Sequence, residues 1–144
     1  MRTRIFYGCI MLWMACTPAP KEIQYGMDAC QFCKMTIMDN QHASQIVTAK
    51  GKVYLFDSIE CMAGYQQVSK EEYAFVLVSD YAQPGSLIAA ETGTFLISDA
   101  LPSPMGANLS AFSDPAEARR LKDEHGGEVY TWTQVSEKIN PTHH

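Results

Sequence analysis

The sequence predicts an α+β protein with two small ββαβ modules in tandem, placed after a lipoprotein signal and a short tether. Strand-like and helix-like segments follow one another in the same order in both halves of the chain. The length of 144 residues suits one ordinary domain or two very small ones. An uncharged apolar run precedes all of these segments, which is typical of an export signal.

The N-terminal segment predicts export and lipidation. Arg2 and Arg4 precede the uncharged apolar residues 5–15, a run that is too short to span a membrane. The junction Ala15-Cys16 is similar to a bacterial lipobox, in which the cysteine becomes the lipidated N-terminus. We therefore expect a signal peptide over 1–15 and lipidation of Cys16, with a plain secretory signal and a buried helix as the alternatives.

A tether is expected over 16–26, because Pro18 and Pro20 favour an extended spacer. Once residues 1–15 are removed and Cys16 is lipidated, three cysteines remain: Cys30, Cys33 and Cys61. An odd number of thiols in an oxidising compartment cannot form a complete disulfide framework, so at least one thiol needs another role.

The first module, 27–82, is expected to form strand, strand, helix and strand. A hairpin is predicted over 43–56 with Lys50-Gly51 at its turn, and the apolar run 73–79 predicts a central strand. Asp57 and Glu60 have the spacing of a capping box, with Asp57 as the N-cap, and predict a helix through about Gln67.

The second module, 83–140, is expected to repeat this order. Two short strands, 86–90 and 94–98, are predicted around Thr92-Gly93, and 108–112 adds another short strand. Asp114-Pro115 predicts a helix start, and Gly126-Gly127 ends that helix after His125, which we expect on its inner face. A strand over 128–132 and a short helix over 133–139 complete the prediction.

Composition and motifs exclude several functional classes. The net charge of −5 argues against nucleic-acid binding, which needs a basic face. Lys34 follows the second cysteine of Cys30-x-x-Cys33 where haem attachment needs histidine, and this CxxC leads into a hairpin rather than a thioredoxin-type helix. The sequence contains no nucleophile elbow, P-loop or GxGxxG.

Sulfur donors are concentrated between positions 27 and 105. Besides the three cysteines, this part of the chain holds Met27, Met35, Met38, Met62 and Met105. Thiolates and thioethers are soft donors that suit Cu(I). In an extended segment Cys33 and Met35 point to the same face and can grip one ion. Three interpretations stay open here: a soft-metal site, a CxxC disulfide or redox pair, and a structural zinc site of Cys30, Cys33, Cys61 and His42 or His125. Methionines that simply fill a core are the plainer alternative.

Five sequence blocks, taken together and in order, resemble the NosL family of lipid-anchored copper chaperones for nitrous oxide reductase. The blocks are DACQFCKMTIMDNQHASQIV, GKVYLFDSIECMAGY, VSDY, SPMGANLSAF and HGGEVYTW. The resemblance implies a non-enzymatic Cu(I)-binding protein on the periplasmic face of the bacterial cell envelope. Its implied partners are nitrous oxide reductase and an ABC-type maturation complex, in addition to the membrane that holds the lipid anchor.

The resemblance also implies a ligand set. The family's Cys-x-Met pair corresponds to Cys33 and Met35, its Met-Gly block to Met105, and its HGG block to His125, while Cys30 is an extra or alternative ligand. Lys34 stands where the family usually has glycine. Whether one chain holds the ion or a weak homodimer shares it stays open.

Overall fold

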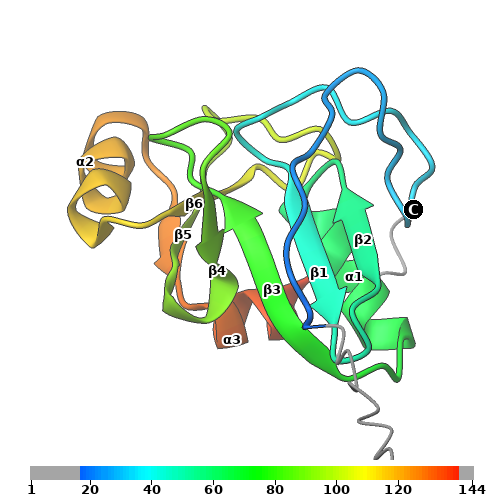
Figure 1. The fold of residues 1–144 in the computed structure, drawn as a ribbon. Helices are drawn as coiled ribbons and strands as arrows, with labels where there is room; N and C mark the ends of the chain where they lie inside the picture. The colour runs from blue at the N-terminus through cyan, green and yellow to red at the C-terminus, as the bar shows by residue number, and fades with distance from the viewer. Residues whose placement is uncertain (1–16, 140–144) are drawn as a thin grey trace, which may run out of the picture.

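The structure, a computed structural model, describes residues 17–139 of the chain. The predicted signal peptide, the lipidation site Cys16 and the terminal His143-His144 lie outside these residues. In chain order (Figure 1) the elements are β1 Ser44–Thr48, β2 Val53–Phe56, α1 Ile59–Val68, β3 Tyr73–Ser79, β4 Leu87–Ala89, the 3₁₀ helix η1 Ala90–Thr92, β5 Thr94–Ile97, β6 Leu109–Phe112, α2 Pro115–His125, β7 Glu128–Tyr130 and α3 Trp132–Lys138. None of the helices within 17–139 is both long and apolar enough to cross a membrane.

The strands form two antiparallel sheets with the same core topology. The first sheet has the order β2-β1-β3-β4 and the second has the order β6-β5-β7. In each module the helix follows the second strand, and the third strand pairs on the far side of the first. The predicted fold class is confirmed. Tyr81 N–H donates to the Ala111 carbonyl at 2.8 Å and connects the two sheets.

The two strands predicted over 86–90 and 94–98 do not pair with each other. β4 pairs with β3 of the first sheet, whereas β5 is the middle strand of the second. The physical reason is the helical turn of η1, in which Gly93 N–H donates to the carbonyls of Ala89 and Ala90 at 3.1 and 3.2 Å. This turn replaces the tight hairpin turn, so the chain leaves one sheet and enters the other.

The start of α1 also differs from the prediction. Ser58, not Asp57, is the N-cap, and its hydroxyl accepts a hydrogen bond from Cys61 N–H at 3.1 Å. The carboxylate of Asp57 therefore has no capping role. At α2 the prediction is confirmed, because Asp114 caps the helix through Ala116 N–H at 2.8 Å and Gly126 follows its last residue.

The described chain enters the fold at one end of the first sheet. The side chain of Gln45 exchanges two hydrogen bonds with the backbone of Lys21, at 2.9 and 2.8 Å, and Ile23 is buried. The blue segment in Figure 1 accordingly runs along β1. Pro18 lies beside Gly51, in the turn between β1 and β2. Asp57 follows the other end of β2, so the entry of the chain and the β2–α1 junction are at opposite ends of the sheet.

The two glycines of the HGG block have structural roles. Gly126 has a φ of +77° and ends α2, and Gly127 has a φ of +107°. A Cβ at Gly127 would overlap the carbonyl oxygen of Ile97 in the neighbouring strand, whereas a Cβ at Gly126 would meet nothing within 4 Å. The second glycine therefore allows β7 to approach β5.

We expect Gly127→Ala to reduce the free energy of unfolding by about 1–3 kcal/mol more than Gly126→Ala, because only the first adds a backbone clash to the cost of positive φ. Chemical denaturation of the two variants measures the difference. Equal losses would contradict the proposed close approach of β7 to β5.

Candidate metal site

Four potential ligands meet where the loop before β1, the end of β2 and the first turn of α1 come together. The Sγ atoms of Cys30, Cys33 and Cys61 and one carboxylate oxygen of Asp57 all lie within 4.8 Å of one another. Cys33 is partly exposed and the other three residues are buried. Among the cysteine, histidine and acidic residues of 17–139, this is the one group with such spacing. We call it the thiol cluster.

A tight loop places the two CxxC cysteines at its tip. Ala29 and Thr36 form an antiparallel bridge, and Cys30 N–H donates to the Met35 carbonyl at 2.8 Å. At the tip, Lys34 N–H donates to the Cys30 carbonyl at 3.1 Å, and Lys34 has a φ of +67°. This left-handed conformation favours glycine over a residue with a Cβ, such as the lysine present here.

The loop is fixed to both neighbouring elements. Gln31 N–H donates to the carbonyl of Leu55 in β2 at 2.7 Å. The ring of Phe32 lies against Gly64 of α1, where an added Cβ would come within 3.1 Å of the ring. Because the same helix carries Cys61 in its first turn, this docking brings the third thiol to the CxxC pair.

Hydrogen bonds converge on the Cys30 sulfur and stabilise its charged form. The strongest influence is the Cys61 thiol, which donates to it, and the backbone N–H groups of Asp57, Cys33 and Phe32 add to this. Together they lower the pKa of Cys30 to about 6, against the opposing effect of burial. The surroundings of Cys30 therefore favour its thiolate form.

The other two cysteines are protonated at neutral pH. Burial is the largest influence on Cys33 and raises its pKa to about 11, although the N–H of Met35 donates to its sulfur. The pKa of Cys61 is also raised. The largest cause is the hydrogen bond that its thiol donates to the Cys30 sulfur. Cys33 and Cys61 therefore carry exchangeable protons that a bound metal would displace.

Asp57 points a free acceptor into this environment. Its Oδ1 atom is buried and has no hydrogen-bond partner. An orphaned buried carboxylate oxygen is costly unless a cation or a proton occupies the place beside it. The sequence analysis missed this residue as a ligand, because the capping-box pattern assigned its carboxylate to the helix.

The methionines of residues 17–139 differ in their exposure to solvent. Met62 is buried in α1, whereas the side chains of Met27, Met35 and Met38 are 82, 57 and 71% exposed. Core filling therefore describes Met62 and does not describe Met35 or Met38. Met105 is partly buried, on a loop that is held to α1 by the hydrogen bond from Ser103 to Glu60, the residue before Cys61.

Neither predicted histidine joins the thiol cluster. His125 is at the end of α2, and its side chain is 42% exposed beside Glu124, so the expected inner-face position is wrong. His125 is the last residue of α2, and Ala118 is the residue of this helix that is buried. His42 is buried, and its Nδ1 lies 2.7 Å from Asp39 while its Nε2 lies 3.2 Å from the Ser110 hydroxyl.

The Asp39–His42–Ser110 arrangement contains the atoms of a hydrolase triad, but no substrate can reach it. Ser110 in β6 is fully buried and His42 is nearly so. A nucleophilic serine must be accessible to a carbonyl carbon. The three residues instead join the segment before β1 to the second sheet by buried hydrogen bonds.

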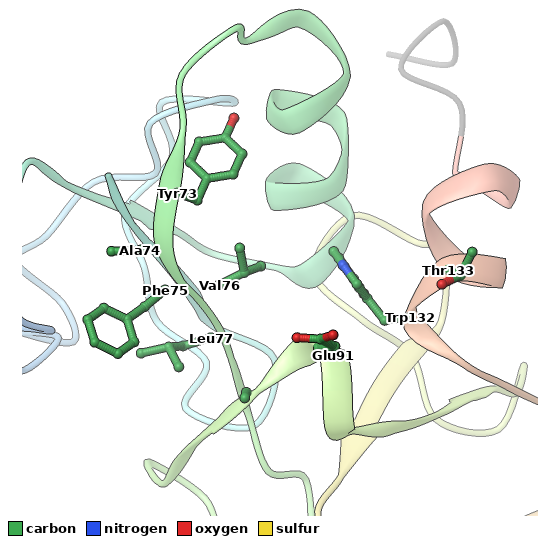
Figure 2. A pocket seen from close by; sticks show the side chains of 9 residues that line it. Tyr73, Ala74, Phe75, Val76, Leu77, Glu91, Trp132 and Thr133 are labelled. Atoms are coloured by element: carbon green, nitrogen blue, oxygen red, sulfur yellow. The ribbon is translucent and has the colours of Figure 1, made fainter. Parts of the chain in front are cut away.

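A groove of about 430 Å³ lies on another part of the surface. Residues of β3, among them Tyr73 and Val76, line it together with Glu91 and Trp132, and Val76 points toward Glu91 and Trp132 (Figure 2). Its lining includes no cysteine, methionine or histidine. The groove therefore offers none of the donors that a soft metal requires.

The hydrogen bond from Cys61 leads to a pH-dependent prediction. Cys61→Ala removes the donor that contributes most to lowering the pKa of Cys30, so this pKa should rise from about 6 toward the ordinary thiol value. A pH titration of the ultraviolet thiolate absorbance of metal-free protein measures the shift. Cys61→Ser keeps a donor and should show a smaller shift; identical titrations of parent and alanine variant would contradict the assignment.

Comparisons with known proteins agree with this fold. A family model described as NosL matches residues 20–140. The copper-binding lipoprotein NosL of Stutzerimonas stutzeri is 26% identical over 121 residues. The match covers 78% of this chain and 64% of that protein, which is less than two thirds of the relative's length. The crystal structure of the copper chaperone NosL from Shewanella denitrificans matches with a TM-score of 0.70 and 20% identity, over 81% of this chain and 94% of that one. Because the family model covers most of the sequence, the chain belongs to the NosL family.

Proposed function

We propose that this protein is a lipid-anchored metallochaperone that binds Cu(I) and delivers it for the maturation of nitrous oxide reductase. The observation that carries the proposal is the thiol cluster, in which three cysteine sulfurs and one carboxylate oxygen lie within 4.8 Å of one another. Relatives named as a copper-binding lipoprotein and a copper chaperone support copper as the cargo. The role is binding and transfer rather than catalysis.

The donors favour the monovalent ion. Cu(I) prefers soft sulfur ligands, and the cluster offers three sulfurs around a single position. The surroundings of Cys30 favour its thiolate, and Cys33 and Cys61 supply thiols that lose their protons when the metal binds. Met35 offers a thioether two residues beyond Cys33.

Exposure of part of the cluster suits release of the ion. Cys30 and Cys61 are buried, Cys33 is partly exposed, and the Met35 side chain is 57% exposed. A partner's ligand can therefore replace the outer sulfurs first, while the inner ones still hold copper. Met105 stays a proposed further ligand on the loop held to α1, whereas exposed His125 is outside the ligand set that we propose.

The chain geometry is compatible with an anchor in the cell envelope. Lipid on Cys16 would hold the protein by the residue just before Thr17, and nearby Pro18 lies beside the β1–β2 turn. The thiol cluster is at the opposite end of β2. We propose that the anchored protein presents its metal site away from the membrane, toward periplasmic partners. These are nitrous oxide reductase and its ABC-type maturation complex.

The geometry gives little support to a thiol–disulfide oxidoreductase. Such an enzyme needs an accessible cysteine of low pKa as its nucleophile. Here the cysteine of low pKa, Cys30, is buried, and the accessible one, Cys33, has a raised pKa. The distribution of charge and exposure is the reverse of what attack on a substrate disulfide requires.

The Asp57 carboxylate supports one second candidate, a resident zinc ion. Three sulfurs and a carboxylate oxygen match the four-coordinate sites that Zn²⁺ prefers. This replaces the histidine that the sequence suggested as the fourth zinc ligand. Such a site would stabilise the loop of residues 26–37 against α1.

We expect Cys33→Ser combined with Met35→Ala to weaken Cu(I) binding by at least about tenfold, or ~1.4 kcal/mol, because it removes the accessible cysteine sulfur and its neighbouring thioether. Anaerobic competition with a Cu(I) chelator measures the affinity. Met62→Leu is the control, since it removes a buried thioether outside the cluster. Parental affinity in the double variant would exclude this ligand assignment.

Asp57→Asn separates copper from zinc. The substitution keeps the side-chain shape but removes the anionic oxygen, so we expect Cu(I) affinity to stay within a few-fold of the parent. Zn²⁺ affinity should fall by about tenfold or more if the carboxylate is a ligand. Parallel titrations with both metals measure the difference. A large loss of Cu(I) affinity would contradict an all-sulfur copper site.

A further inference from the structure

Two methionines outside the thiol cluster have highly exposed side chains, which is unexpected for an apolar residue. Met27 and Met38 are 82 and 71% exposed, and they are the two most exposed of the large apolar side chains of 17–139. Exposed thioethers contribute almost nothing to packing. Their shared chemistry is a soft, uncharged sulfur donor that is open to solvent.

The backbone brings these two residues side by side. Gly26 N–H donates to the Ile37 carbonyl at 2.8 Å, and Ile37 N–H donates to the Asp28 carbonyl at 2.9 Å. The two neighbours of Met27 are thus bonded to the residue directly before Met38. Methionine has three flexible side-chain bonds, so two thioethers on adjacent backbones can turn toward one ion.

The thioethers are the donors of the pair that are open to an ion. Each methionine is followed by an aspartate, Asp28 after Met27 and Asp39 after Met38. Asp28 is ion-paired with Lys21 at 3.2 Å and Asp39 lies 2.7 Å from His42, so these carboxylates already have partners. The same loop carries Cys30 and Cys33 at its tip, so an ion held at its base would be one loop length from the thiol cluster.

We propose that Met27 and Met38 form a second, transient site that receives a soft monovalent ion and passes it to the thiol cluster. This inference rests on the proposed function, because the methionine pair would be the site at which the Cu(I) cargo first binds. Thioethers bind without losing a proton and hold the ion more weakly than thiolates, so transfer proceeds toward the cysteines.

The transfer is a ligand exchange. Bonds between copper and the thioether sulfurs of Met27 and Met38 break as bonds to the sulfurs of Cys30 and Cys33 form. Any thiol that binds the copper releases its proton to water as the new bond forms. Copper stays Cu(I) throughout, so the step requires no oxidant or reductant.

Met27→Leu combined with Met38→Leu tests the role in loading, because leucine keeps the apolar volume and removes the sulfur. We expect the rate of copper transfer from a Cu(I)–bicinchoninate complex, followed anaerobically by stopped flow, to fall at least about tenfold. The equilibrium affinity should equal that of the parent. Met62→Leu serves as the matched control and should load at the parental rate.

The outcomes separate the two proposals. If the parent takes no Cu(I) at equilibrium, the proposed function fails and this inference fails with it. If the parent binds Cu(I) and the double leucine variant loads at the parental rate, only the inference is overturned. An equal loss of equilibrium affinity and rate would also overturn it, by making the two methionines permanent ligands.

A spectroscopic measurement on the parent protein gives an independent readout. After one equivalent of Cu(I) has filled the thiol cluster, Ag(I) is added as a second soft monovalent probe. We expect the isotope-labelled methyl resonances of Met27 and Met38 to shift first, while that of buried Met62 stays in place. Shifts spread equally over all the methionines, or none at the pair, would contradict the site.

Discussion

The hydrogen bonds that converge on the Cys30 sulfur are the constraint on which the metal site depends. They come from the thiol of Cys61 in α1 and from amides of the CxxC loop and the β2–α1 junction. A buried thiolate without these donors would be costly, and the loop would lose a major reason to close against β2 and α1. The same bonds therefore set the charge of the site and bring together residues that are distant in the sequence. Metal affinity and local folding are coupled through one sulfur atom.

Burial decreases stepwise from the inside of the site to its surface. Cys30 and Cys61 are enclosed, Cys33 is at the boundary, and Met35 is in solvent. A chaperone must retain its ion and still release it to a partner. Ligands that differ in burial allow both retention and release. The enclosed thiolate contributes affinity, and the outer donors contribute exchange with a partner. A fully buried set of four ligands would favour a resident metal instead, which is why the role of Asp57 distinguishes the two candidate functions.

Local sequence patterns predicted most of the fold. Apolar runs located β1, β2 and β3, and the start signals at Asp57/Glu60 and Asp114-Pro115 located both long helices, all within one or two residues. The exchange of β4 into the first sheet was not predictable, since Gly93 looks like a hairpin residue and only the tertiary contacts decide for a helical turn. At α1, Ser58 and Asp57 are both good N-caps, and in the structure Ser58 caps the helix while Asp57 joins the thiol cluster.

The candidate site was predictable only in part. The spacing of Cys30, Cys33 and Met35 identified soft donors near the start of the domain, but the approach of Cys61 and Asp57 depends on packing of Phe32 against Gly64. X-ray absorption spectroscopy of the protein loaded anaerobically with one equivalent of Cu(I) tests the central claim most directly. The account predicts copper that remains monovalent and is surrounded by sulfur alone. A first shell dominated by nitrogen or oxygen would contradict it.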